Sequence, residues 1–219
     1  SCTMRFFPGP KKVRELLAEG VIGKPLSFTY HTGQYLPDWH PWESISDFYV
    51  SNRATGGCRE IVPFELTWLN ALFGDPEPLA CVATRLGQLD ADIDEIYQCL
   101  LRYPGGVLAN LTIDVLSRPC ATRSLRILGS EGQLVFDADE SCVRYIRVGQ
   151  TGWQRSELAG GSVEQGYINP EEPYIEELRL FIAALEQGDK SIFPNTLQED
   201  ARVLDLLTRL EALSDGLAQ

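Results

Sequence analysis

The chain has 219 residues, 44% hydrophobic and 23% charged, which is the composition of a globular protein with a sizeable core. Its 31 acidic residues outnumber 19 basic ones, and a formal net charge of −12 disfavours binding to nucleic acid. The sequence has no run of about 18 apolar residues, which would predict a membrane span, and no export signal is visible.

The cysteines and histidines do not predict a metal site. The six cysteines are scattered without a C-x-x-C pair, and only two histidines could assist them. Structural zinc sites need clustered ligands. Because a chain of this size does not need disulfides for stability, we expect reduced thiols in a cytoplasmic protein.

The first predicted elements are a helix and a strand. A short helix follows Pro8, carries one apolar face and ends near Gly20, which suits a C-terminal cap. In the next segment Leu26, Phe28 and Tyr30 alternate with polar residues, which predicts a half-buried strand.

Two helices are predicted in the next part of the chain, after an aromatic, proline-rich loop over 35–43. A short helix is expected over 44–50. A longer helix is predicted from Gly57 to Phe73, and Pro63 should kink or break it, because proline lacks the N–H that the helix needs.

From Pro78 to Val148 most segments alternate apolar and polar residues, which predicts successive strands. Tyr103–Gly106 and Gly129–Gly132 read as tight turns. The connections are too short for crossover helices, so we expect a largely antiparallel sheet of at least six strands. Residues 149–170 are rich in glycine and polar residues and are expected to form a loop.

Two helices are predicted to close the chain. Pro173 fits the first turn of one of them, and apolar residues at helical spacing define its expected buried face. These residues are Tyr174, Leu178, Phe181, Ile182 and Leu185. A capping box over Thr196–Glu199 opens the other helix, whose expected buried residues are Val203, Leu207 and Leu210.

The order of elements predicts a single α+β domain over residues 1–219, with an open, mainly antiparallel sheet flanked by helices. No G-x-G-x-x-G and no G-x-x-x-x-G-K-[ST] motif occurs. Such motifs bring backbone amides to a phosphate, so we do not expect this chain alone to bind a nucleotide.

Several segments resemble, in order and spacing, the C-terminal domain of the Gfo/Idh/MocA oxidoreductases. They are Met4–Pro8, Glu19–Pro25, Tyr35–Glu43, Thr55–Glu60, Leu69–Gly74, Gly129–Gly132, and Asp200 with Val203 and Leu204. The resemblance spans nearly the whole chain and implies the same kind of sheet. It also implies that the family's N-terminal Rossmann half is absent from this chain. NAD or NADP is then expected to bind mainly to that half, with no cofactor on this chain alone.

The resemblance further implies hydride transfer at a hydroxyl-bearing carbon of a sugar or sugar derivative. In many relatives an Asp and a His, four residues apart, face the substrate from one side of a helix. Glu60 falls at the Asp position, Phe64 at the His position and Thr67 where a further Asp often stands; a shift of one residue would put Ile61 at the Asp position. Because Phe64 cannot transfer a proton, the candidate catalytic residues here are Glu60 and His40, beside a lysine of the missing half.

The candidate substrate-binding residues are Tyr35, Trp39, Trp42, Arg59, Phe64, Thr67 and Arg118. The three aromatic residues of the 35–43 loop could stack on a sugar ring, or equally form a packed loop or an interface. Arg59 and Arg118 could bind a carboxylate or phosphate, or form surface ion pairs.

The candidate catalytic residues have structural alternatives too. Glu60 could be an ion-paired helix acid, and His40 a surface imidazole packed between Trp39 and Trp42. Phe64 is a packing or sugar-stacking residue, since its ring has no exchangeable proton.

Three functions stay open at this point: half of an active dehydrogenase, a sugar-binding pseudo-enzyme without turnover, and an oligomerisation module. One face of the sheet should pack on helices, whereas the other would expose residues such as Leu108 and Leu116. We therefore expect a homo-oligomer formed through the sheet face, with a small sugar-type molecule as the other partner.

Overall fold

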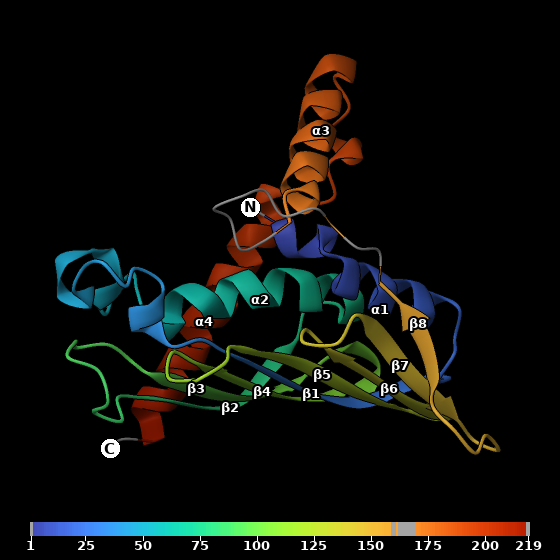
Figure 1. Ribbon diagram of the computed structural model, residues 1–219, viewed down its shortest axis with the longest axis horizontal. Helices are drawn as coiled ribbons and strands as arrows, with labels where there is room; N and C mark the ends of the chain where they lie inside the picture. Colours follow the sequence, from blue (N-terminus) through green and yellow to red (C-terminus); the bar gives the residue numbers. More distant parts are fainter. Residues whose placement is uncertain (1, 159–160, 162–169, 218–219) are drawn as a thin grey trace.

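The computed structural model describes residues 2–158, 161 and 170–217, which form one sheet with helices on one side of it and beyond one edge (Figure 1). The eight strands are β1 (Pro25–Gly33), β2 (Glu77–Thr84), β3 (Ile96–Arg102), β4 (Leu108–Asp114), β5 (Thr122–Gly129), β6 (Gly132–Asp137), β7 (Cys142–Arg147) and β8 (Gln154–Glu157). The α-helices are α1 (Pro8–Ala18), α2 (Cys58–Phe73), α3 (Glu172–Gln187) and α4 (Leu197–Leu217). Short 3₁₀ turns are η1 (Thr3–Phe6), η2 (Leu36–Asp38), η3 (Ile45–Asp47), η4 (Tyr49–Ser51), η5 (Pro104–Gly106) and η6 (Lys190–Ile192).

The strand order in the sheet is β2-β3-β4-β1-β5-β6-β7-β8. Strand β1 lies between β4 and β5; its pairing with β4 is parallel, and every other pairing in the sheet is antiparallel. The predicted α+β class and mainly antiparallel sheet are thus confirmed. Because Gly33 is the register partner of Asp114, β1 and β4 end side by side, and the segments after both strands leave from the same end of the sheet.

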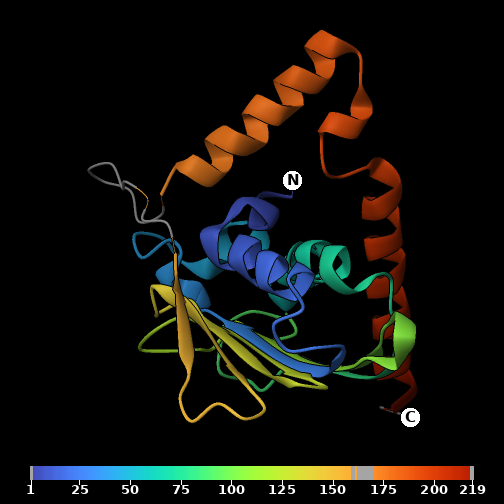
Figure 2. The same ribbon diagram turned by 90° about the vertical axis from the view of Figure 1, so that its right-hand side faces the viewer.

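The two faces of the sheet have different surroundings. Along β4, Ala109 and Leu111 are buried, whereas Leu108 and Asn110 are exposed. Helices α1 and α2 cover the first face, and the helices of the described residues leave the second face open (Figure 2). This alternation is the one expected for an antiparallel sheet with a single helical layer.

Helix α2 lies on the sheet through Val62, Leu66 and Leu69, all fully buried. The sequence predicts a kink or a break at Pro63, and the break is wrong, because α2 runs through that proline without interruption. Buried residues on both sides of Pro63 hold the two halves of the helix on the same sheet, which offsets the lost hydrogen bond. The helix predicted over 44–50 is instead two 3₁₀ turns, η3 and η4.

The two C-terminal helices differ in what covers them. The capping box that opens α4 is confirmed: Thr196 N–H donates to Glu199 Oε2 at 2.7 Å, and Glu199 N–H donates to Thr196 Oγ1 at 3.1 Å. The predicted buried residues Val203, Leu207 and Leu210 are indeed buried, where α4 packs on β2 and α2.

The predicted burial of α3 is wrong. The five side chains of its predicted buried face keep between 45% and 67% of their surface exposed. Figure 2 shows α3 standing away from the sheet and from α1 and α2. Helical spacing identifies an apolar stripe but not the surface that covers it, so the sequence could not distinguish these two helices.

The loop predicted over 149–170 contains a strand. Gln154–Glu157 pairs with β7 as the edge strand β8. All four of its residues are polar, so the alternation that predicts a strand is missing. Residues 159–160 and 162–169 of the predicted loop lie outside the described residues.

All six cysteines are free thiols. Cys81 and Cys99 face each other across β2 and β3 with their sulfur atoms 3.7 Å apart, and both are buried. Burial raises the pKa of the Cys2 thiol to about 12 and also raises the pKa of Cys58. These thiols therefore serve as apolar packing residues rather than nucleophiles. Within the described residues, no helix combines the length and the apolar character needed to cross a bilayer.

Three buried tyrosines should make the fold sensitive to alkaline pH. Burial raises the pKa of Tyr30, Tyr97 and Tyr103 above its ordinary value, which is about 10 in an unfolded chain. Their contribution to stability is complete below about pH 10 and is lost as pH rises from there towards the folded-state pKa. We expect the thermal midpoint to fall above about pH 10, with these tyrosines ionising only on unfolding. Tyrosinate absorbance followed together with circular dichroism tests this, and ionisation of every tyrosine before any loss of ellipticity would contradict it.

Candidate functional site

The candidate site lies where β1 and β4 end. The Leu36 N–H donates to the Val115 carbonyl at 3.1 Å, which holds the segment after β1 against the segment after β4. The Arg118 guanidinium then lies over the Tyr35 ring, 4.6 Å from its centroid. The parallel pairing of β1 and β4 thus brings together two predicted site residues that are distant in sequence.

Helix α2 begins beside the same end of the sheet, since the Cys58 thiol lies 3.4 Å from the Ile113 carbonyl at the end of β4. Gly57, just before the helix, has φ of 62°, a backbone conformation that favours glycine. The first turns of α2 therefore present Glu60 and Phe64, four residues apart on one side of the helix, near the ends of β1 and β4.

Glu60 has one satisfied and one free carboxylate oxygen. Tyr49 O–H donates to Glu60 Oε1 at 2.7 Å, and burial together with this bond raises the pKa of Tyr49 to about 12, so the phenol stays a donor at neutral pH. Glu60 Oε2 is buried and has no hydrogen-bond partner among the described residues. Phe64, one turn further along, is 36% exposed. A buried acceptor without a donor is rare and indicates a site for a ligand hydroxyl or a water.

His40 belongs to a column of stacked aromatic rings. Its ring stacks on Trp42 at 5.1 Å and on Phe48 at 4.5 Å between centroids, and its Nδ1 lies 2.5 Å from Glu43 Oε1. The packing predicted between Trp39 and Trp42 is therefore corrected: Phe48, not Trp39, is the second neighbour. Trp42 ends the column with 76% of its surface exposed.

Two predicted substrate-binding residues are engaged elsewhere. Arg59 Nε donates to Glu211 Oε1 on α4 at 2.6 Å, which is the ion-pair alternative for this residue. Thr67 is 5% exposed, and its hydroxyl donates to the Pro63 and Phe64 carbonyls of its own helix. Both side chains therefore have partners within the domain, and a role for them in substrate binding stays a prediction. Trp39 is half-buried, and its indole Nε1 has no hydrogen-bond partner among the described residues.

A buried polar network under α2 was missed by sequence reasoning. Glu65 is fully buried and accepts hydrogen bonds from Tyr30 O–H at 2.5 Å, Trp68 Nε1 at 2.9 Å and Arg123 Nη2 at 2.7 Å. Burial would lower the pKa of Arg123, but the facing Glu65 carboxylate raises it above its usual range. The network joins α2 to β1 and β5, and so fixes which side of α2 carries Glu60.

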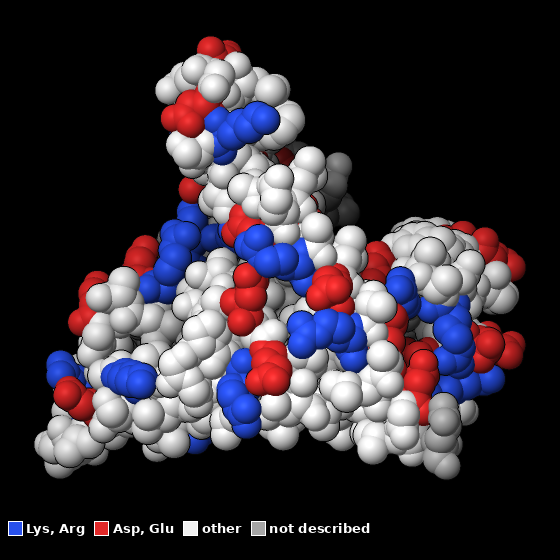
Figure 3. Space-filling model, turned by 180° about the vertical axis from the view of Figure 1, so that it is seen from behind, with Lys and Arg blue, Asp and Glu red and all other residues white. Residues whose placement is uncertain are grey.

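No local pattern identifies this network, because its members come from separate elements. The spacing from Tyr30 to Glu65 is 35 residues and from Glu65 to Arg123 is 58 residues. On the face of the molecule seen in Figure 3, acidic and basic side chains are interspersed. In the described ranges, no group of three or more His, Cys, Asp or Glu side chains is arranged to hold a metal ion.

Known proteins resemble this chain in sequence and in fold. The trans-1,2-dihydrobenzene-1,2-diol dehydrogenase of Mus musculus is 28% identical over 117 residues, covering 52% of this chain and 32% of that protein. A levoglucosan dehydrogenase in complex with NADH and L-sorbose has a TM-score of 0.76 at 18% identity, covering 98% of this chain and 62% of its own. An inositol dehydrogenase homolog from Azotobacter vinelandii, complexed with NADH and myo-inositol, has a TM-score of 0.73 at 14% identity. The match covers 98% of this chain and 61% of the homolog's chain.

These comparisons also give the extent of the match. The chain spans about a third of the length of the curated relative and about three fifths of the solved chains. The model of the GFO/IDH/MocA C-terminal domain matches residues 11–135, more than half of the chain, and this segment includes β1 to β5 and all of α2. The chain therefore belongs to the Gfo/Idh/MocA oxidoreductases, as their C-terminal domain.

Proposed function

We propose that this chain is the substrate half of an NAD(P)-dependent oxidoreductase that acts at a hydroxyl-bearing carbon of a sugar or related polyol. The three proteins named above support this substrate class, since their names refer to a trans-diol, a ketose and a cyclic polyol. Each of these ligands carries neighbouring hydroxyl groups, which need hydrogen-bond acceptors in a binding site.

The observation that carries the proposal is the Glu60 carboxylate. Its Oε2 atom is buried without a hydrogen-bond partner in the part of the chain that the structure describes, while Oε1 is held by Tyr49. A ligand hydroxyl donating to Oε2 would satisfy that atom and be oriented by a side chain that is already fixed. Phe64, on the same side of α2, offers a ring face on which the C–H side of a sugar could pack.

The remaining site residues are assigned supporting roles. Arg118, held over Tyr35, offers guanidinium donors to polar groups of the substrate, and Trp42 offers an exposed ring at the outer end of the aromatic column. Bound NAD or NADP supplies the hydride acceptor or donor, and we assign its binding to an N-terminal Rossmann half that precedes this chain. Glu60 then holds the substrate hydroxyl whose proton is exchanged, together with a base from that half.

The test uses the full-length protein with NAD⁺ and NADP⁺ and a panel of ketoses, aldoses, inositols and a trans-diol. We expect reduced nicotinamide to appear with at least one polyol and one cofactor, and calorimetry to show cofactor binding by the full-length protein but not by this chain. Micromolar binding of NAD(P)H to this chain alone would overturn the assignment of cofactor binding to the other half.

Phe64 favours a second candidate, a sugar-binding protein without turnover. Its ring stands where many relatives carry the histidine that transfers a proton, and it cannot replace that chemistry. This candidate is favoured if the full-length protein binds both polyol and cofactor in calorimetry while no polyol of the panel gives reduced nicotinamide. The same panel therefore separates the two functions.

We further propose a homo-oligomer that covers the open face of the sheet, in a cytoplasmic protein. Leu108 and Leu128 flank Ser27 on this face and are 44% and 45% exposed. Apolar residues clustered on an exposed sheet face are typical of a subunit interface.

Replacing both leucines of the open face by aspartate should convert the full-length protein into monomers, because like charges would then face each other across the interface. Sedimentation measures the change. The matched control is Val148→Asp, a residue that is 83% exposed and follows β7 outside the sheet. A wild-type protein that is monomeric at high concentration would contradict the proposal.

A further inference from the structure

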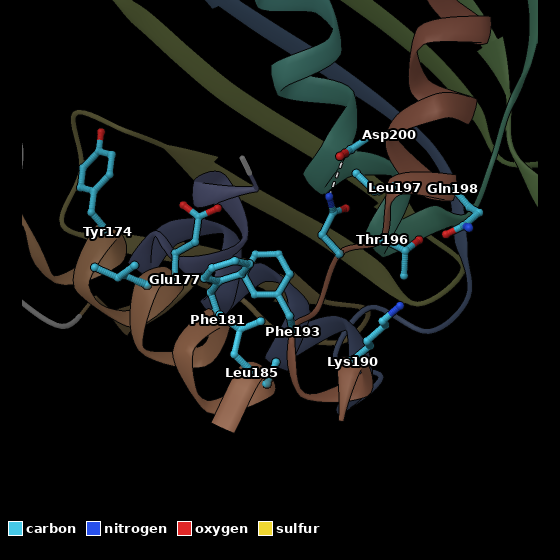
Figure 4. A pocket seen from close by; sticks show the side chains of 13 residues that line it. Tyr174, Glu177, Phe181, Leu185, Lys190, Phe193, Thr196, Leu197, Gln198 and Asp200 are labelled. Carbon is cyan, nitrogen blue, oxygen red and sulfur yellow. Dashed lines mark hydrogen bonds between the residues drawn. The ribbon is translucent and has the colours of Figure 1, made fainter. Parts of the chain in front are cut away.

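A hollow of about 810 Å³ lies between α3, η6 and the start of α4 (Figure 4). Its wall is apolar where Leu178, Phe181 and Leu185 of α3 face Phe193 and Leu197. Phe181 and Phe193 contact each other edge to face, with ring centroids 5.9 Å apart. Leu197 and Leu185 nevertheless keep 82% and 67% of their surface exposed. The hollow is thus an open apolar surface rather than part of the core.

The apolar stripe of α3 extends beyond the hollow. Ile175 and Ile182, about a quarter turn around the helix from the hollow, are 59% and 45% exposed. An apolar helix stripe of this kind normally packs against another surface, and an isolated helix of this length is only marginally stable in water. The surface that covers α3 is therefore not among the described residues.

The N-terminal segment of the chain meets α3 at its base. The Cys2 backbone N–H donates to Glu177 Oε1 at 2.8 Å, and the Phe7 ring contacts the Tyr174 ring with centroids 6.1 Å apart. Figure 2 marks this end of the chain in the space beneath α3, between α1 and α4. Any polypeptide that precedes Ser1 therefore leaves the domain beside the hollow.

Arg5 fastens this N-terminal segment to α2 and to the start of α4, beside the hollow. Its Nε donates to the Thr67 carbonyl of α2 at 3.2 Å, and its Nη1 donates to the Pro194 carbonyl between η6 and α4. Its Nη2 pairs with Glu199 in the first turn of α4 at 3.4 Å. The entering chain, the site helix α2 and the base of the α3–α4 pair are thus held together by one side chain.

The solved relatives show that enough additional chain exists to cover α3. They match 98% of this chain, but this match is only about three fifths of their own length. In Figure 1, α3 rises on the same side of the sheet as α1 and α2, opposite to the open face. A body seated against α3 would therefore also lie over the side of the domain that carries α2.

We propose that the hollow and the apolar faces of α3 are the docking surface for the polypeptide that precedes Ser1 in the full-length protein. This docking proposal shares one assumption with the proposed function, namely that the full-length protein has an N-terminal half. Because that half enters beside the hollow, its contact with α3 is intramolecular and benefits from a high effective concentration, an advantage that a second copy lacks. Docking on α3 places the N-terminal half above α2, where Glu60 and Phe64 lie.

Hydrogen–deuterium exchange of this chain and of the full-length protein tests the proposal without any cofactor or substrate. We expect amides of α3 to exchange at least about tenfold more slowly in the full-length protein, because covered helices open less often. Amides of α4 around Leu206–Leu210, buried in this chain, serve as the internal reference. Equal exchange of α3 in both proteins overturns the proposal, and so does protection of α3 in this chain alone that rises with concentration, since a second copy would then cover it.

A variant pair locates the contact. Phe181→Asp with Leu185→Asp in the full-length protein should return α3 to the fast exchange of the isolated chain, whereas Gln187→Asp, an exposed position outside the hollow, should not. Since both side chains are already exposed in this chain, the changes should leave its own folding intact, which exchange in α4 verifies. Undiminished protection in the double variant overturns the proposal. A protein with protected α3 but no affinity for NAD(P) supports docking while rejecting the proposed function.

Discussion

Replacing Glu65 by alanine is expected to lower the free energy of unfolding by about 3–5 kcal/mol, the range typical for breaking a buried ion pair from one side. The change removes the acceptor of Tyr30, Trp68 and Arg123 and leaves the Arg123 guanidinium, whose side chain is 22% exposed, without its counter-charge. A domain of ordinary stability, about 5–15 kcal/mol, would lose a large part of it.

Denaturant unfolding of this chain measures that loss. The matched control is Glu77→Ala, which breaks the exposed pair with Arg102 at 3.5 Å and should cost less than about 1 kcal/mol. The double change Glu65→Leu with Arg123→Met should recover much of the loss, because it leaves no unpaired charge. A cost below about 1 kcal/mol for Glu65→Ala would show that the network does not hold α2 on the sheet.

Replacing Glu60 by glutamine in the full-length enzyme should lower kcat by about 10²–10⁴, the range usual for a group that takes part in acid–base catalysis. The amide keeps the shape of the side chain, but it loses the charge that accepts the substrate proton or orients the substrate hydroxyl. His40→Asn should have a much smaller effect, since His40 is stacked between Trp42 and Phe48 and paired with Glu43.

Two further variants separate the roles within the site. Tyr49→Phe removes the donor to Glu60 Oε1 and should weaken catalysis less than Glu60→Gln does, since the carboxylate itself remains. Phe64→His should raise kcat if the site keeps a place for the histidine of many relatives. A change in kcat of less than about threefold on Glu60→Gln corresponds to a change of less than about 1 kcal/mol in the activation barrier. Such a result would show that Glu60 does not take part in the reaction. Unchanged thermal midpoints control for misfolding.

The parts of the fold that the sequence predicts are those with a local physical signal. Alternation of apolar and polar residues identifies the strands between Pro78 and Val148, and the capping box at Thr196 identifies the start of α4. Strand β8 escapes this reasoning, because Gln154–Glu157 has no apolar residue and is held only by its pairing with β7. The insertion of β1 between β4 and β5 likewise depends on contacts between distant segments.

The site shows the same division. The family resemblance points to Glu60 and Phe64, and helical spacing places them on one side of α2. The structure adds the Tyr49 contact and a Glu60 Oε2 atom without a hydrogen-bond partner among the described residues. The Glu65 network could not be predicted, since a glutamate next to Phe64 on a helix looks like a surface residue until its partners are in place. The ion pair of Arg59 could not be predicted either, because its partner Glu211 is 152 residues away in sequence.

The most direct test of the central claim is transfer of deuterium from a reduced nicotinamide labelled at C4. The full-length protein is incubated with labelled NADH or NADPH and a panel of keto-sugars and ketocyclitols, and the products are analysed by mass spectrometry. The account predicts that the wild type forms a polyol carrying one deuterium on the former carbonyl carbon. The Glu60→Gln variant should form the same product at a rate lower by about 10²–10⁴. The account is contradicted if the protein binds both nicotinamide and polyol but forms no labelled product.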